Sequence, residues 1–328
     1  MHSVRGIWHW PATATAQLQQ EFPQVAFCTY PRAVEDPLTD TTAAAEAELF
    51  ADADAVIAWR LDPRLWRGAK RLRWIHCPSS AVHQLLSPEL IASPIAVTNG
   101  ASVHAAMVAE HGVALLLALA RRLPEAMQDQ AAARWQPERW LGRMRRVAGA
   151  TAVIAGLGNI GRELAPRLAA LGMKVLGVRH HPELPVAGCA VVYGDQQLEE
   201  LLPRADYLVL ALPATEATAA RVAAPQLALL PPHAFLLNLG RGTALDEGAL
   251  LAALQTGRLA GAALDVFGRE PLPPDSPLWH CPRLLISPHV AAAVPDTWDL
   301  QAALVARHLR NFLTGQPLSP LVDKARGY

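Results

Sequence analysis

The chain has 328 residues, enough for two domains of ordinary size, and its 52% hydrophobic content predicts a substantial buried core. Its 29 basic side chains equal its 29 acidic ones, so its charge favours neither a nucleic acid nor a membrane surface as a partner. The longest apolar run, 113–120, is too short to span a membrane, the N-terminus lacks a signal pattern, and the 4 cysteines and 12 histidines form no metal-binding motif, so we expect a cytoplasmic protein without a metal.

The first part of the chain contains four short apolar segments that are typical of β-strands. These segments cover residues 25–30, 55–59, 73–77 and 95–99. The apolar stretch from Ala105 to Ala120 then predicts a long helix that begins near Ser102. The stretch 134–146 is basic, contains tryptophan and has no regular period, so we expect a solvated connecting loop there.

From residue 151 onward, short apolar segments alternate with helical patterns, which predicts parallel sheets covered by helices on both faces. The predicted strands cover 151–158, 173–178, 208–213, 234–240, 259–266 and 284–288, and the predicted helices cover 160–171, 197–205, 247–254 and 297–313. We therefore expect an α/β fold of two Rossmann-like, doubly wound domains with a cleft between them. Residues 1–100 plus 294–328 would form a substrate domain and residues 101–293 a dinucleotide-binding domain, with hinges near Gly100 and Val294.

A glycine motif, Gly156-Leu-Gly158-Asn159-Ile160-Gly161, lies between a predicted strand and a predicted helix. This context is what a dinucleotide-binding loop requires. Gly156 would permit the tight turn, Gly158 would let a pyrophosphate approach the backbone, and Gly161 would allow close helix packing. Asn159 and Ile160 open the helix, whose N-terminus would hold the negative charge. We predict that all five residues contact the cofactor.

The end of the next predicted strand distinguishes between the two nicotinamide cofactors. An NAD enzyme usually carries an acid there for the ribose 2′-hydroxyl, but this chain has Arg179 and His180, and no acid before Glu183. A guanidinium pairs well with a 2′-phosphate. We therefore predict NADP(H) as the preferred cofactor, bound by Arg179 with help from His180, and NAD(H) as the alternative. The competing interpretation is a surface arginine in an NAD site.

Polar residues follow three other predicted strands, in the contexts NLGR (Arg241), ALDVFGREP (Asp265, Glu270) and SPHVAA (His289). With the glycine motif, this order of arginine, glutamate and histidine resembles the D-isomer-specific 2-hydroxyacid dehydrogenase family. The segment LPATEAT at 212–218 and VAEH at 108–111 are similar to stretches of the same family. The resemblance covers nearly the whole chain and is densest from 148 to 293.

The resemblance implies a reaction and a site. His289 would act as acid and base with Glu270 as its partner, while Arg241 would bind the carboxylate of a small 2-oxo or D-2-hydroxy acid. Asp265 would hold the nicotinamide carboxamide. Leu212, Pro213, Thr218 and Leu239 would line the cofactor cleft, and the turn at Ser79, Ser80 and Ala81 would contribute to binding of the substrate beside Arg241 and His289. A homodimer formed through the helix from Ser102 and the loop up to Arg146 is also implied.

The chain departs from the family pattern at several positions. Ala81 and His83 replace a glycine and an acid in the substrate turn, Met107 stands where a threonine is common, and Ala291 and Ala292 replace two glycines after His289. These differences leave the choice of substrate and the physiological direction open.

Three other functions remain as alternatives. A cofactor-sensing scaffold without enzymatic activity could keep the same motifs, but long tails and interaction repeats are missing. A formate or phosphite dehydrogenase would need further polar residues near the substrate. A phosphoglycerate dehydrogenase would need more basic groups for a phosphate and room for a regulatory domain. NADPH oxidation with 2-oxo acids would distinguish the first of these from an enzyme.

Overall fold

The computed structural model describes residues 10–29 and 47–328. The chain divides into two compact units: one contains the residues up to 104 together with 293–328, and the other contains 105–292. Within the described residues, parallel neighbours form a three-stranded sheet in the first unit and a seven-stranded sheet in the second. We call them the short-sheet unit and the long-sheet unit. The predicted α/β fold with parallel sheets in two domains is confirmed.

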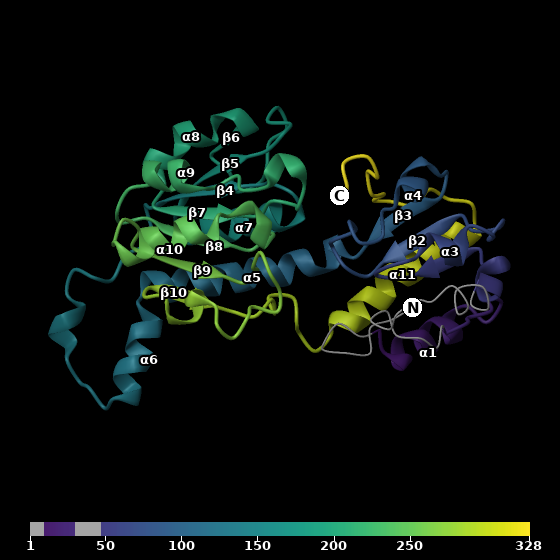
Figure 1. Ribbon diagram of the computed structural model, residues 1–328, viewed down its shortest axis with the longest axis horizontal. Helices are drawn as coiled ribbons and strands as arrows, with labels where there is room; N and C mark the ends of the chain where they lie inside the picture. The colour runs from purple at the N-terminus through teal and green to yellow at the C-terminus, as the bar shows by residue number, and fades with distance from the viewer. Residues whose placement is uncertain (1–9, 30–46) are drawn as a thin grey trace. The chain divides into compact units, whose positions relative to one another are not determined.

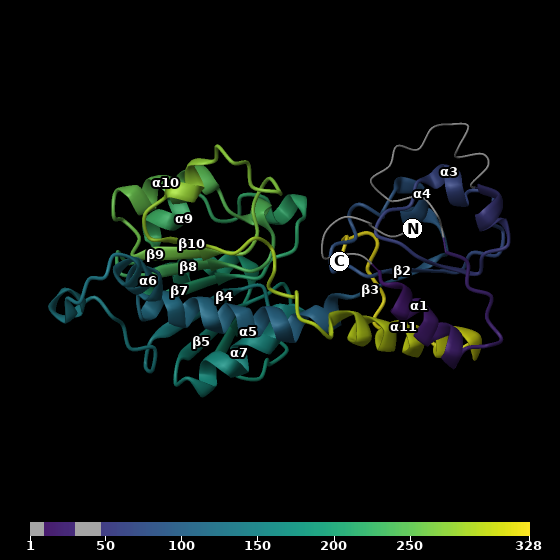
Figure 2. The same cartoon turned by 90° about the horizontal axis from the view of Figure 1, so that it is seen from below.

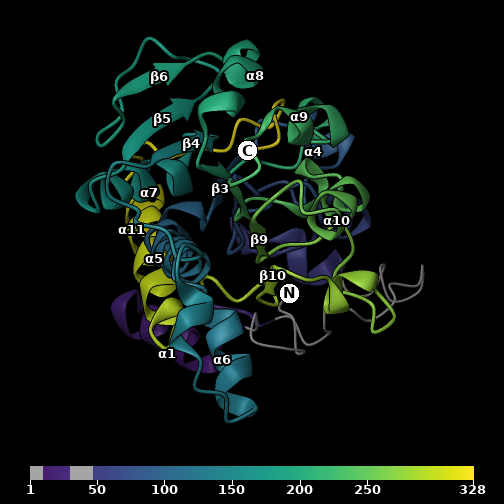
Figure 3. The same ribbon diagram turned by 90° about the vertical axis from the view of Figure 1, so that its left-hand side faces the viewer.

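The long sheet has the strand order β10-β9-β8-β7-β4-β5-β6 (Figure 1), and Figure 3 shows β6, β5 and β4 toward one side of it and β9 and β10 toward the other. Every residue of β7, β8 and β9 is buried, which agrees with the continuous apolar runs that predicted buried parallel strands. The short edge strand β6 is the only strand of this sheet that the sequence analysis did not predict. The strands are β4 Thr151–Ala155, β5 Lys174–Val178, β6 Val191–Tyr193, β7 Tyr207–Leu210, β8 Phe235–Asn238, β9 Gly261–Leu264 and β10 Leu284–Ile286.

Helices cover both faces of the long sheet: α5 and α7 lie on one face, and α9 and α10 on the other (Figures 1 and 2). The α-helices of this part of the chain are α5 Ala101–Ala120, α6 Leu123–Ala131, α7 Asn159–Ala170, α8 Leu198–Leu201, α9 Ala224–Leu229 and α10 Glu247–Gln255. Short 3-10 helices are η1 Pro137–Trp140, η2 Asp195–Gln197, η3 Leu202–Arg204, η4 Glu216–Thr218, η5 Gly242–Ala244 and η6 Pro277–His280.

Helix α5 is long and apolar enough to cross a membrane by length and composition alone. Its packing identifies a different role. A Cβ atom on Gly112 would lie 2.4 Å from Leu239 Cδ1, so this glycine lets the helix approach the sheet closely. Half of its most apolar stretch is buried in the structure. We therefore assign α5 as a core helix of the long-sheet unit.

The short sheet contains β1 Ala55–Ile57, β2 Trp74–Cys77 and β3 Ala96–Asn99, which lie within three of the predicted strands. The fourth prediction, at 25–30, is wrong for its described part, because residues 25–29 form no strand. Val25 and Phe27 instead pack their side chains against the core near Trp74. Residues 47–51 are helical, and the other helices are α1 Ala12–Glu21, which was not predicted, α3 Pro63–Trp66, α4 Pro88–Ala92 and α11 Thr297–Leu313.

The end of the chain completes the short-sheet unit. Helix α11 packs against α1 on one face of the sheet (Figure 2), and Val305 and Leu309 on α11 are buried in the core. Beyond the helix, Val322 N–H donates to Val97 O at 2.8 Å, and Lys324 Nζ donates to the backbone carbonyls of Leu90 and Ile95 at 2.9 and 3.1 Å. This unit is therefore built from both ends of the sequence.

Candidate active site

The glycine loop joins β4 to α7. Gly156 has a φ of +101°, and a Cβ there would lie 2.5 Å from Ala211 O, so this turn requires glycine. A Cβ on Gly161 would lie 2.1 Å from Gly156 O, so the third glycine lets the helix pack against the loop. A Cβ on Gly158, in contrast, would meet no atom within 4 Å. The chain itself therefore gives no steric reason for this glycine.

The loop fits a pyrophosphate group. Gly158 is exposed and caps the N-terminus of α7, where the first backbone N–H groups of a helix attract negative charge. Asn159 and Ile160 are half-buried at the first two positions of α7. Asn159 Oδ1 accepts a hydrogen bond from Arg162 Nη2 at 2.7 Å, which holds a further positive charge beside this turn. Open space at Gly158 and a positive helix terminus are the features that a bound phosphate needs.

Arg179 and His180 lie where β5 ends. Arg179 N–H donates to Tyr193 O at 3.0 Å, which joins the ends of β5 and β6, and its guanidinium makes no hydrogen bond or ion pair with any residue that the structure describes. His180 Nδ1 lies 3.1 Å from Asp195 Oδ2, and Asp195 follows β6 closely. Folding therefore brings an acid to a strand end where the local sequence has none.

The predicted cofactor-lining residues lie between β7 and α9 and after β8. Thr218 Oγ1 donates to Pro213 O at 2.6 Å, so this hydroxyl closes the 212–218 loop on itself. Leu212 and Pro213 are half-buried at the end of β7, and Gly240 packs against the Leu212 backbone. The Leu239 side chain is buried against α5, so only its backbone could face a cofactor.

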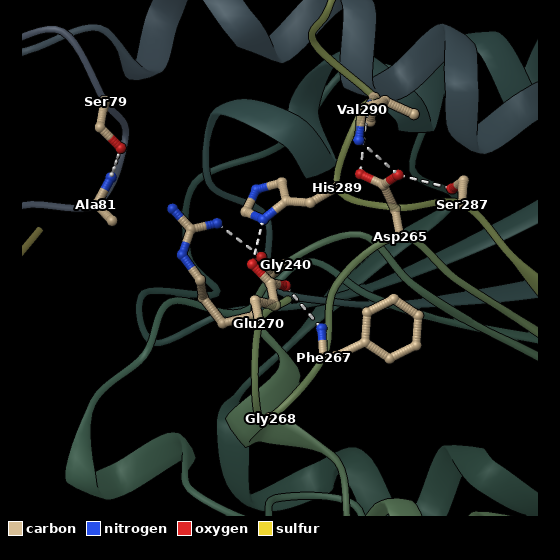
Figure 4. Close-up of polar contacts among 12 residues, drawn as sticks. Ser79, Ala81, Gly240, Asp265, Phe267, Gly268, Glu270, Ser287, His289 and Val290 are labelled. Carbon is tan, nitrogen blue, oxygen red and sulfur yellow. Dashed lines mark hydrogen bonds and ion pairs between the residues drawn. The ribbon is translucent and has the colours of Figure 1, made fainter. Parts of the chain in front are cut away.

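The three predicted catalytic residues follow adjacent strands: Arg241 follows β8, Glu270 follows β9 and His289 follows β10. Parallel strands place their carboxyl ends at one edge of the sheet. His289 Nδ1 lies 2.6 Å from Glu270 Oε2, and the two side chains point toward each other (Figure 4). Glu270 Oε1 accepts from Phe267 N–H at 2.8 Å, and Arg241 Nη1 donates to Gly240 O at 2.7 Å.

The charges at this edge influence one another. Burial alone would raise the pKa of Glu270, but the hydrogen bonds from His289 and Phe267 and the charges of His289 and Arg241 outweigh it, so the pKa of this carboxyl lies below its usual value. Burial lowers the pKa of Arg241, and the negative charge of Glu270 opposes that effect. A guanidinium nevertheless stays protonated in proteins. The site therefore combines a fixed cation with an ionised carboxylate against an imidazole.

His289 has a left-handed backbone, with a φ of +53°. This conformation costs a residue with a side chain about 1–2 kcal/mol. Asp265, which is 2% exposed, compensates for it: Val290 N–H donates to Oδ1 at 3.1 Å (Figure 4), and Ala291 N–H donates to Oδ2 at 3.2 Å. Hydrogen bonds to a charged group contribute about 1.5–3 kcal/mol each, enough to offset the strain. The predicted contact of Asp265 with a carboxamide stays a prediction.

Two polar residues beside Asp265 were not predicted as site residues. Ser287 Oγ lies 2.6 Å from Asp265 Oδ1, and His111 Nε2 on α5 lies 2.9 Å from Ser287 Oγ. Both stand in segments that the resemblance covers, VAEH and SPH. Only the fold reveals that they meet, because 176 positions separate them in the chain. Within the described residues, no group of three or more His, Cys, Asp or Glu side chains is placed to hold a metal ion.

The predicted substrate turn follows β2 in the short-sheet unit. Ala81 N–H donates to Ser79 Oγ at 3.1 Å, so this donor is used within the turn. Ser80 Oγ lies 3.3 Å from His104 Nδ1, and Asn99 Nδ2 donates to Ser80 O at 3.3 Å. The turn is thus tied to the end of β3 and the start of α5.

Comparison with known proteins identifies the family. Residues 113–291 match the sequence family described as the D-isomer specific 2-hydroxyacid dehydrogenase, NAD binding domain. A glyoxylate reductase from Korarchaeum cryptofilum is 33% identical over 287 residues, covering 84% of this chain and 85% of the relative. The glyoxylate/hydroxypyruvate reductase B of Yersinia pestis is 38% identical over 226 residues, which cover 67% of this chain and 68% of the Yersinia protein.

A solved structure extends the likeness to three dimensions. The NADPH-dependent glyoxylate/hydroxypyruvate reductase of Sinorhizobium meliloti, in complex with NADP and sulfate, matches with a TM-score of 0.78 and 26% identity over 97% of both chains. The chain belongs to the D-isomer-specific 2-hydroxyacid dehydrogenase family, which confirms the resemblance drawn from its motifs. It is therefore an NAD(P)-dependent oxidoreductase that acts on small 2-hydroxy or 2-oxo acids.

Proposed function

We propose that this protein reduces a small 2-oxo acid to its D-2-hydroxy acid with NADPH, and that NADH serves less well. The observation that carries the proposal is the His289–Glu270 pair, 2.6 Å apart, at the same sheet edge as Arg241 and the glycine loop. Glyoxylate and hydroxypyruvate are the first substrates to test, because the names of relatives include them.

Each residue would have a distinct task in this reaction. The nicotinamide would supply the hydride to the carbonyl carbon of the substrate. The planar guanidinium of Arg241 would pair with the substrate carboxylate and draw electron density from the carbonyl oxygen. His289 would donate a proton from Nε2 to that oxygen, while Glu270 would stabilise the imidazolium through Nδ1.

The cofactor preference rests on Arg179. Its guanidinium has no anionic partner among the described residues, so a 2′-phosphate would gain a full charge-assisted contact there. The relative from Sinorhizobium meliloti is NADPH-dependent and was solved with NADP. Asp195 would work against this preference, but its carboxylate is engaged by His180.

Replacement of the proposed proton donor tests the reaction. His289→Ala should lower turnover of glyoxylate by about 10²- to 10⁴-fold, because acid catalysis contributes about that much, while NADPH affinity stays nearly unchanged. His233→Ala is the matched control, since His233 pairs with Asp206 at the opposite end of the strands. Normal turnover of His289→Ala would remove His289 from the mechanism. A wild-type chain that binds NADPH but reduces no 2-oxo acid would favour the cofactor-sensing scaffold.

We also propose that the chain forms a homodimer through α6 and the loop that follows it. Trp135 is 92% and Leu141 82% exposed, an unusual exposure for large apolar side chains. Ion pairs tie the loop to α6, because the buried Asp129 pairs with Arg134 at 2.9 Å and with Arg139. Light scattering of the purified chain measures the oligomeric state directly, and a monomer would refute this proposal.

A further inference from the structure

Asp265 belongs to a hydrogen-bond network that connects helix α5 to the segment after β10, which carries His289. The network runs from His111 on α5 through the hydroxyl of Ser287 to Asp265 Oδ1, with distances of 2.9 and 2.6 Å. His111 Nε2 also lies 3.6 Å from Asp265 Oδ1. The side chain of Asp265 is almost fully buried, whereas that of His111 is 26% exposed.

The chemistry of the groups fixes the direction of these hydrogen bonds. The Asp265 carboxylate can only accept, so the single hydroxyl hydrogen of Ser287 points to Asp265. Ser287 therefore can only accept from His111, whose Nε2 must carry a hydrogen. His111 thus donates to Ser287, and Ser287 donates to Asp265. Each member of the chain orients the next one.

The Asp265 carboxylate also fixes the backbone directly after His289. Its two oxygens accept the N–H groups of Val290 and Ala291, the two residues that directly follow His289. His289 N–H itself donates to Ser287 O at 3.0 Å. The left-handed His289 is therefore tied through its own N–H to the backbone carbonyl of Ser287, and the residues after it are tied to the Asp265 carboxylate, which also accepts from the Ser287 hydroxyl.

We propose that His111, Ser287 and Asp265 are positioning residues for His289. They hold the turn after β10 in the one conformation that aims the imidazole at Glu270. The inference rests on the proposed role of His289 as proton donor. It gives Asp265 a task that does not require contact with the nicotinamide, and it gives α5 a part in catalysis through His111.

The test separates positioning from cofactor binding. Ser287→Ala removes the hydroxyl that links His111 to Asp265, and we expect kcat to fall by about 10- to 100-fold, since a displacement of about 1 Å can cost that much. The KM and the dissociation constant for NADPH should stay nearly unchanged. Ser287→Thr restores a hydroxyl and should recover most of kcat.

A second pair of variants tests the hydrogen-bond network at His111, where it begins. His111→Leu should lower kcat like Ser287→Ala, whereas His111→Gln offers an N–H donor near the place of Nε2 and should recover much of it. His233→Leu is the matched control, because it breaks another histidine–aspartate contact, at 2.8 Å from Asp206, far from His289 along the strands. Circular dichroism of each variant verifies the fold.

The outcomes discriminate clearly. Wild-type kcat in both Ser287→Ala and His111→Leu would overturn the inference, as would a loss confined to NADPH affinity, which would assign Asp265 to the cofactor instead. If Ser287→Ala does not fold, the His111→Leu and His111→Gln pair decides. Failure of the proposed function has a different signature, namely normal turnover in His289→Ala.

Discussion

Replacement of Arg179 by alanine measures directly which cofactor the protein is built to use. The residue follows β5, on the strand next to the one that carries the glycine loop, and its guanidinium has no partner among the described side chains. A 2′-phosphate placed there would form hydrogen bonds between two charged groups. The bare 2′-hydroxyl of NADH offers no comparable contact, so the substitution should affect the two cofactors unequally.

The size of the effect follows from that contact. Hydrogen bonds to charged groups contribute about 1.5–3 kcal/mol, and about 1.4 kcal/mol corresponds to a tenfold change in an equilibrium or rate ratio. We therefore expect Arg179→Ala to lower kcat/KM for NADPH by about 10- to 100-fold. The value for NADH should change little. The ratio of the two efficiencies should fall by the same factor as the NADPH value.

The assay is steady-state reduction of glyoxylate with each cofactor. Arg204→Ala is the control, because Arg204 is an exposed arginine that precedes β7, at the opposite edge of the sheet. Asp195→Asn should move the ratio the other way, since it removes the negative charge near His180. An unchanged ratio in Arg179→Ala, or a wild-type enzyme that prefers NADH, would refute the assignment of this site to a 2′-phosphate.

Two further predictions concern pH and the glycine loop. The pKa of Glu270 lies below its ordinary value of 4.5, so its contribution to stability is complete above that pH and is lost as pH falls through the folded value. The difference in free energy of unfolding between the wild type and Glu270→Gln, measured with urea, should be constant near neutrality and shrink below about pH 4.5; a difference independent of pH down to 3 would contradict this. Gly161→Ala should lower the melting temperature, because its Cβ would lie 2.1 Å from Gly156 O. Gly158→Ala should keep the melting temperature and weaken NADPH binding, and equal losses of stability in both variants would refute our explanation of the loop.

Local sequence was sufficient to predict most of the long sheet. Its buried strands are continuous apolar runs. Arg241, Glu270 and His289 follow three of these strands, and they stand at one edge of the sheet because parallel strands place their carboxyl ends together. The glycine motif was predictable from its place between a strand and a helix: Gly156 and Gly161 meet backbone requirements of the fold, whereas Gly158 leaves open space at the helix terminus. The parallel arrangement of the strands and the family both agree with these predictions.

The remaining features depend on contacts between distant segments. Strand β6 has three residues, Val191–Tyr193, and follows a glycine-containing turn, so its pattern is too short to recognise. Within 25–29, only Val25 and Phe27 pack their side chains against the core, and the segment forms no strand. The pairing of Asp195 with His180 and the chain from His111 to Asp265 join separate strands and helices, which no local pattern encodes.

The short-sheet unit takes its first segment from the residues up to 104 and its last from 293–328, and α11 supplies Val305 and Leu309 to its core. During synthesis on the ribosome, the segment made first must wait for the one made last. The continuous stretch 105–292 has all of its strands available earlier and can fold while the rest is still being translated. We therefore expect the long-sheet unit to complete its fold first, while the early segment lacks its packing partner until α11 emerges.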